Sequence, residues 1–212
     1  YGMKLSLIII LLTAFSSFGQ EPEVAIELVE HNVLHRGYKN RMAIGVTNNN
    51  EGTPSISCTN CDTIYWLESN EFVIVPGKAY LTSVLVSLSF KDTLVFVKKI
   101  NYRVQDLPDP TVFWGAARSG QKGSRSSRLV QVKYPPNIPL SEDFIILKWT
   151  LSVNGTSISG VGNGFRHANL KDANDLIEST IEGDKVIIDV EVKGPDGILR
   201  ELSGVYTIKL NT

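Results

Sequence analysis

Two cysteines separated by two residues are the first candidates for chemistry in this chain. Cys58 and Cys61 form a C-x-x-C motif. Such motifs act in redox enzymes when they lie at the start of a helix, which lowers the pKa of the thiol. Here residues 56–57 and 64–66 are typical of strands, so we expect the motif in a turn between strands. We favour a structural disulfide that fixes this turn, and the alternatives are a redox pair and free or metal-linked thiols.

The histidines do not complete a catalytic or metal-binding pattern. His31 and His35 are four residues apart in a segment expected to be strand or turn. In a strand or turn that spacing does not place two imidazoles on one metal ion as it does on a helix. The chain contains neither a G-x-S-x-G elbow nor an H-E-x-x-H motif. We therefore expect no catalytic residue, no metal site and no cofactor, and we predict that the protein is not an enzyme.

A basic segment that begins at a tryptophan is the main candidate for an interaction surface. Residues 115–128 are rich in glycine, serine and arginine and follow neither helical nor strand periodicity, so we expect a loop. Its candidate contact residues are Trp114, Arg118, Lys122, Arg125 and Arg128. One interpretation is a solvated linker. The other is a contact for an acidic protein surface or an anionic envelope polymer, with Trp114 as an aromatic anchor.

The charge balance gives no general attraction to polyanions. The 212 residues include 21 Lys and Arg against 22 Asp and Glu, a net charge of −1. Hydrophobic residues make up 42% of the chain, which is enough for a folded core. We therefore do not expect nucleic acid as a partner.

The first residues predict a secretory signal peptide. Lys4 precedes an apolar run over residues 5–15, and small residues follow at Ser17 and Gly19. The run is shorter than the roughly 20 residues that a transmembrane helix needs. We expect cleavage of residues 1–19 and a mature protein in the periplasm, or outside the cell, with no transmembrane segment.

Alternating apolar residues predict a β-sandwich in the first half of the chain. In residues 79–90 the even-numbered positions are mainly apolar, and residues 94–104 repeat the pattern after a short turn at Lys91-Asp92. Shorter strands are expected at residues 24–29, 42–46 and 72–75. Several short strands with regular turn signals are typical of a sandwich, and we expect an Ig-like one.

Two prolines predict the end of this domain. Pro108 and Pro110 lack a backbone donor and restrict the residue before them, so regular structure should stop there. We place the first domain at residues 21–107, a linker at 108–110 and a second domain at 111–212.

The second domain is also expected to be rich in strands. Residues 145–153 and 186–192 alternate, with Ile145 and Leu147 expected on the core side. Apolar positions 170, 173, 177 and 181 have helical spacing, and a turn at residues 194–197 precedes a last strand at 205–210. The predicted fold class is mainly β, with two consecutive β-sandwich-like domains and one short helix in the second.

Four short segments recur in an order and spacing that resemble one family. They are HNVLHRGYKN at residues 31–40, YRVQDLPDP at 102–110, GNGF at 162–165 and VKGPDGILREL at 192–202. Together they resemble the carboxy-terminal periplasmic domains of GldM, called PorM in related bacteria. The resemblance implies an Ig-like sandwich followed, across a proline-containing linker, by a terminal β-rich domain. It also implies a place in the type IX secretion and gliding-motility machinery of Bacteroidetes, where a transmembrane motor component extends a dimeric periplasmic rod toward an outer-membrane ring.

The predicted signal peptide stands where this family has a transmembrane helix and membrane-proximal domains. We therefore expect a stand-alone exported relative of the distal rod, a non-enzymatic accessory that contacts other envelope proteins. Secretion-ring or motor components and a second copy of the chain are the expected partners. The alternative is an envelope module that binds glycan or peptide through the basic loop and Trp114.

Overall fold

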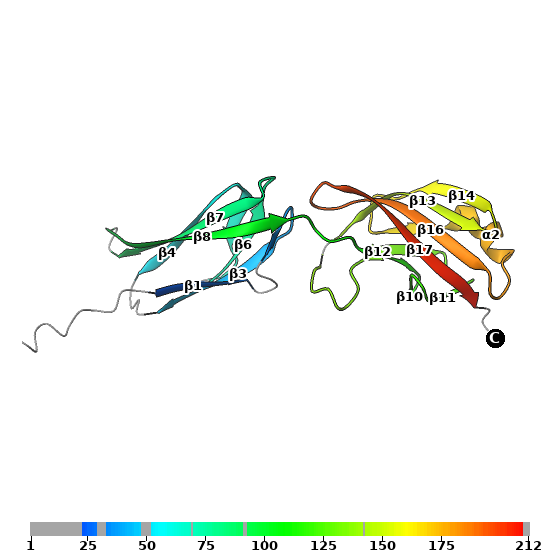
Figure 1. Ribbon diagram of the computed structural model, residues 1–212, viewed down its shortest axis with the longest axis horizontal. Coiled ribbons are helices and arrows are strands. Elements are labelled where there is room, and N and C mark those ends of the chain that lie inside the picture. The colour runs from blue at the N-terminus through cyan, green and yellow to red at the C-terminus, as the bar shows by residue number, and fades with distance from the viewer. Residues whose placement is uncertain are drawn as a thin grey trace, which may run out of the picture.

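The computed structural model describes residues 23–28, 33–47, 52–68, 70–90, 93–141 and 143–209. The predicted signal peptide at residues 1–19 lies outside these ranges. The described chain is mainly β, which confirms the predicted fold class. Strands before residue 106 and strands after residue 110 belong to separate sheets. We call these parts the N-terminal half (residues 23–105) and the C-terminal half (residues 111–209), and they lie end to end (Figure 1).

The N-terminal half consists of two four-stranded sheets. One has the order β1 (Glu23–Leu28), β3 (Asn40–Thr47), β6 (Glu71–Pro76) and β5 (Cys61–Trp66). The other has the order β2 (Leu34–His35), β8 (Thr93–Gln105), β7 (Leu81–Phe90) and β4 (Thr53–Thr59). When the strands are lettered A, A′, B, C, D, E, F and G along the chain, these orders become A-B-E-D and A′-G-F-C. That is the strand arrangement of an immunoglobulin sandwich.

The alternation predicted for β7 places one row of side chains between the two sheets. Val84 and Val86 are fully buried and Leu88 is 1% exposed. They pack with Met42 of β3 and Phe72 of β6 in one apolar cluster. The pairing of β7 with β8 is antiparallel, as the predicted hairpin requires.

The C-terminal half also has two sheets. The four-stranded one has the order β10 (Ala117–Arg118), β9 (Thr111–Trp114), β12 (Leu129–Lys133) and β15 (His167–Asn169). The five-stranded one has the order β11 (Lys122–Ser124), β17 (Leu199–Lys209), β16 (Lys185–Lys193), β13 (Ile145–Val153) and β14 (Thr156–Val161). All of these pairings are antiparallel except that of β11 with β17.

The predicted helix is short and is preceded by a 3₁₀ turn. The turn η1 (Lys171–Ala173) leads directly into α2 (Asn174–Glu178). Leu170, Ala173 and Ile177 are fully buried, as their spacing predicts. Ile181 lies beyond the end of the helix and is 67% exposed, so its assignment to the apolar face was wrong. Among the described residues, no helix is long and apolar enough to cross a membrane.

Three details of the C-terminal half differ from the predictions. The segment 115–128 is not simply a loop, because β10 and β11 lie within it and β11 pairs with the end of β17. The last strand begins at Leu199, directly after the 194–197 turn, and not at residue 205. In β13 the register shifts between Ile146 and Lys148, so Ile146 is buried and Ile145 is 38% exposed.

Candidate functional site

The two cysteines are joined by a disulfide between two edge strands. Cys58 lies one residue before the end of β4, and Cys61 is the first residue of β5. Their Cα atoms are 5.9 Å apart. Asn60 between them has a positive φ of 61°. Because β4 and β5 belong to different sheets, the bond fixes the point where the chain crosses from one sheet to the other. A strand follows the motif, which is not the helix start that activates redox thiols.

Replacing both cysteines with serine is expected to lower the free energy of unfolding by a moderate amount. The closed loop has a sequence separation of 3, for which the chain-entropy model gives about 2 kcal/mol. Urea unfolding followed by tryptophan fluorescence, to which Trp66 of the N-terminal half contributes, would measure the loss. Adding a reductant to the unaltered protein should give the same shift, and loss of the cooperative transition in either case would contradict the prediction.

Trp114 is part of the core, so its predicted role as an exposed anchor is wrong. Its side chain is 1% exposed, and its indole N–H donates to the Ser127 carbonyl at 3.1 Å. The ring packs edge-on against Tyr206 with centroids 5.7 Å apart. Gly123 lies so close that a Cβ there would be 2.4 Å from the ring. Strands β9, β11 and β17 therefore enclose this side chain.

The predicted basic surface is divided by internal pairing. Arg125 donates to the Thr180 carbonyl at 3.0 Å and lies 3.7 Å from the Glu178 carboxylate. Arg128 forms an ion pair with the same Glu178 and donates to Asn174 Oδ1 at 2.7 Å. Both arginines thus attach the 115–128 segment to α2. Arg118 and Lys122 are exposed on β10 and β11.

The segment between the two halves is hydrogen-bonded from both sides. From the N-terminal half, Arg36 Nη1 donates to Asp106 Oδ1 at 2.6 Å. From the C-terminal half, Arg200 Nη2 donates to the Leu107 carbonyl at 2.9 Å and its Nε donates to Asp109 Oδ1 at 3.0 Å. We call residues 106–110 and these contacts the junction.

Arg200 reaches the junction from a buried ion pair with Asp196. The Arg200 side chain is 6% exposed and the Asp196 side chain 0% exposed. Arg200 Nη2 lies 2.5 Å from Asp196 Oδ2 and its Nη1 lies 3.0 Å from Oδ1, so the guanidinium binds both carboxylate oxygens. The Ile198 N–H also donates to Asp196 Oδ1, at 3.1 Å. Such a two-point contact fixes direction as well as distance.

Apolar and backbone contacts complete the junction. Tyr38, from the loop between β2 and β3, and Leu107 are 4% and 3% exposed and belong to the hydrophobic core of the C-terminal half. Gly37 has a φ of 65° and lies against the backbone of Pro195 and Asp196. The two halves therefore share part of one core.

Acid is expected to weaken the fold through Asp196. Burial opposes its ionisation, but hydrogen bonds from Arg200 and the backbone, with the charge of Arg200, lower its pKa below the ordinary value of 3.8. The ionised form is therefore favoured by folding, and this stabilisation is complete above about pH 5 and is lost as pH falls through the folded pKa. Urea midpoints between about pH 6 and pH 3 would measure it. An equal decline in Asp196→Asn would contradict this origin.

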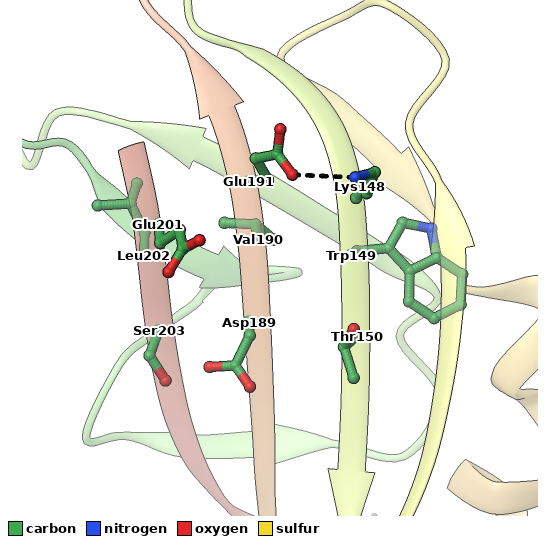
Figure 2. A pocket seen from close by; sticks show the side chains of 9 residues that line it. All are labelled: Lys148, Trp149, Thr150, Asp189, Val190, Glu191, Glu201, Leu202 and Ser203. Atoms are coloured by element: carbon green, nitrogen blue, oxygen red, sulfur yellow. Dashed lines mark ion pairs between the residues drawn. The ribbon is translucent and has the colours of Figure 1, made fainter. Parts of the chain in front are cut away.

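A shallow hollow lies on the outer face of the five-stranded sheet (Figure 2). Its volume is about 430 Å³, and side chains from β13, β16 and β17 surround it. Asp189, Glu191 and Glu201 supply three negative charges and Lys148 one positive charge, a net charge of −2. Lys148 Nζ lies 3.3 Å from the Glu191 carboxylate. The Trp149 ring points away from the hollow, beneath β14.

The hollow contains two like charges on neighbouring strands. Glu191 and Glu201 are directly opposite each other on β16 and β17. Like charges in such a cross-strand pair are unfavourable. The arrangement makes this face suited to a positively charged partner surface. Among the described residues, no group of three or more His, Cys, Asp or Glu side chains could hold a metal ion.

A second, larger hollow of about 600 Å³ lies on the outer face of the other half. Tyr65, Val73 and Arg41 form a row across β5, β6 and β3, and Ser141 of the C-terminal half closes one side. We call this second hollow the groove. Sequence reasoning missed the groove and the junction, because both combine residues far apart in the chain. The signal for the junction was present, however. Segments 31–40, 102–110 and 192–202 of the resemblance contain Gly37, Leu107 and Arg200, which meet there.

Comparisons with known proteins give only distant structural similarities. No protein-family model matches the chain, and no curated protein matches it in sequence. The fibronectin(III)-like modules of Clostridium thermocellum CbhA align with 14% identity over 89% of this chain and 95% of theirs, with a TM-score of 0.29. Domains 5–6 of the S-layer protein SbsC align with 12% identity over 90% of this chain and 98% of theirs, with a TM-score of 0.29.

A glucan-utilization protein gives a similar result. SGBP-B of Bacteroides ovatus, solved with a mixed-linkage heptasaccharide, aligns with 12% identity and a TM-score of 0.30. The alignment covers 90% of this chain but 48% of that one, so this chain spans about half the length of that protein. At these TM-scores the similarities carry no functional argument.

Proposed function

We propose that the protein is a non-enzymatic structural and interaction module of the cell envelope, formed by two halves joined at a fixed angle. The junction is the observation that carries this proposal. Neighbouring domains move relative to each other by default unless their interface is large and apolar. Here a buried ion pair, a shared core and hydrogen bonds to Asp106, Leu107, Pro108 and Asp109 of the junction oppose that motion; the Pro108 carbonyl accepts from the Tyr134 hydroxyl at 2.9 Å. A fixed angle is useful to a component that keeps two partners at a set distance.

The setting we propose is the type IX secretion or gliding machinery of Bacteroidetes, as an exported accessory that resembles the distal part of GldM. Three of the four segments that carry the resemblance meet at the junction, which supports a common arrangement of the two halves. The residues shared with the GldM family would then be the ones that determine the angle between the two halves. Secretion-ring or motor proteins in the periplasm are the proposed partners.

The acidic hollow is the surface proposed to contact them. Its three carboxylates face outward with one ammonium group, so it is complementary to a basic protein surface. Glu191 and Glu201 lie opposite each other, with Glu191 paired to Lys148, and a cationic partner would reduce the repulsion between the two carboxylates. We propose this surface, in place of the basic segment 115–128, as the main contact.

A photo-crosslinking amino acid at position 201 tests the proposal in intact cells of the host. We expect adducts with ring or motor components, identified by mass spectrometry, and reduced secretion or gliding in a deletion strain. The matched control places the same amino acid at exposed Asp175 on α2, away from the hollow. Recovery of neither class of component, together with normal secretion and gliding after deletion, would reject the proposal.

A further inference from the structure

The groove beside the junction contains an exposed aromatic ring next to paired charged groups. Tyr65 is 39% exposed on β5, and Val73 behind it is 2% exposed. Because Tyr65, Val73 and Arg41 are aligned across three strands, Val73 forms the floor and the other two side chains flank it. Leu67, 44% exposed, extends the apolar surface beyond Tyr65.

The polar groups of the groove are oriented by each other. Arg41 Nη2 lies 2.6 Å from Glu71 Oε2, with side chains 55% and 31% exposed. The pair therefore keeps N–H donors and carboxylate lone pairs in contact with solvent at the groove. Leu67 N–H and Glu68 N–H donate to the Glu71 carbonyl at 2.9 and 3.3 Å, which fixes the loop that carries Leu67.

The charges of the groove cancel. Lys39 and Arg41 are positive and Glu68 and Glu71 negative, two of each sign, for a net charge of 0. A polyanion would meet two carboxylates and a polycation would meet two basic groups. The groove thus favours a ligand that is uncharged but rich in hydrogen-bonding groups.

The groove is also preformed, and the strand on its floor has no free edge. Tyr38 on its wall is buried in the core of the C-terminal half, so the junction fixes the distance between its two sides. Strand β6 on its floor is paired on both sides, with β3 and β5. A peptide could not pair with β6 as an added strand.

We propose that this groove binds a neutral oligosaccharide. A pyranose ring has an apolar C–H face that packs on an aromatic ring, and vicinal hydroxyl groups that donate and accept hydrogen bonds. Tyr65 supplies the aromatic surface, and beside it Arg41 supplies donors and Glu71 supplies acceptors. This binding is independent of the proposed envelope partners, because it uses the other half of the protein.

Isothermal titration calorimetry of the mature protein with neutral hexasaccharides tests the inference. The probes are cellohexaose, laminarihexaose, mannohexaose and fully N-acetylated chitohexaose. We expect at least one to bind, and Tyr65→Ala to weaken that binding by about tenfold, the value of one aromatic contact. Tyr65→Phe, which keeps the ring, should retain the affinity.

Tyr80→Ala is the matched control, because Tyr80 is 75% exposed in the same half but does not line the groove. Its affinity should be unchanged. Any one of three results would overturn the inference. They are failure of all four hexasaccharides to bind, an equal loss of affinity in Tyr80→Ala, and tighter binding of heparin than of any neutral probe. Failure of these tests would leave the crosslinking result at position 201 unaffected.

Discussion

Replacing Arg200 with methionine is expected to lower the free energy of unfolding of the C-terminal half by about 3–5 kcal/mol. The substitution keeps much of the aliphatic stem but leaves the Asp196 carboxylate, which is 0% exposed, without its cation. A buried charge without a partner is costly, whereas the pair itself contributes little net energy. Urea unfolding followed by tryptophan fluorescence would measure the loss, because two of the three tryptophans, Trp114 and Trp149, lie in the C-terminal half.

Two further variants separate this cause from a general packing defect. Adding Asp196→Asn to Arg200→Met removes the uncompensated charge, so part of the lost stability should return. Arg166→Met removes an arginine whose ion pair with Asp143 is exposed, with side chains 63% and 73% exposed, and should cost less than about 1 kcal/mol. Equal losses in Arg166→Met and Arg200→Met would contradict the assignment.

The predictions from sequence succeeded where a contact is local. The alternation in β7 identified Val84, Val86 and Leu88 as core residues, because strand side chains point alternately to opposite faces. The turn at residues 194–197 follows from residue type, since Gly197 adopts a positive φ of 78° and its N–H donates to the Gly194 carbonyl at 3.0 Å. Pattern and turn chemistry are both properties of short segments.

The predictions from sequence failed where one extra residue changed the register of a strand. Leu147 has no partner in the pairing of β13 with β16, so the residues before it face the opposite way from those predicted. This β-bulge buries Ile146 and exposes Ile145. Nothing in a continuous apolar run such as Phe144 to Leu147 indicates which residue will be the extra one.

They also failed where a contact joins distant residues. Trp114 is buried because Gly123 and Tyr206 enclose its ring, which its neighbours in sequence do not indicate. Arg200 and Leu107 are 93 positions apart, although their hydrogen bond determines how the halves meet. A single sequence contains the residues of the junction but not the information that they are in contact.

Replacing Gly37 with alanine is expected to separate the two halves while each stays folded. Its φ of 65° favours glycine, and a non-glycine residue there costs about 1–2 kcal/mol. The new Cβ would also lie 2.6 Å from the Pro195 carbonyl oxygen and 2.7 Å from Asp196 Cα. Both are backbone atoms of the turn that carries Asp196, so a rotamer change cannot relieve the contact.

The expected result is a longer particle with a cleavable linker. Small-angle scattering should give a larger radius of gyration, and limited proteolysis should cut within residues 106–110, while Trp66 and Trp149 still report folded surroundings. Gly120→Ala is the control, because Gly120 has a φ of 87° but no atom within 4 Å of the added Cβ. Gly120→Ala therefore has the backbone strain of Gly37→Ala but not its contact with a neighbouring backbone. Unchanged scattering in Gly37→Ala would mean that the junction tolerates the displaced turn, and the fixed angle would lose its main support.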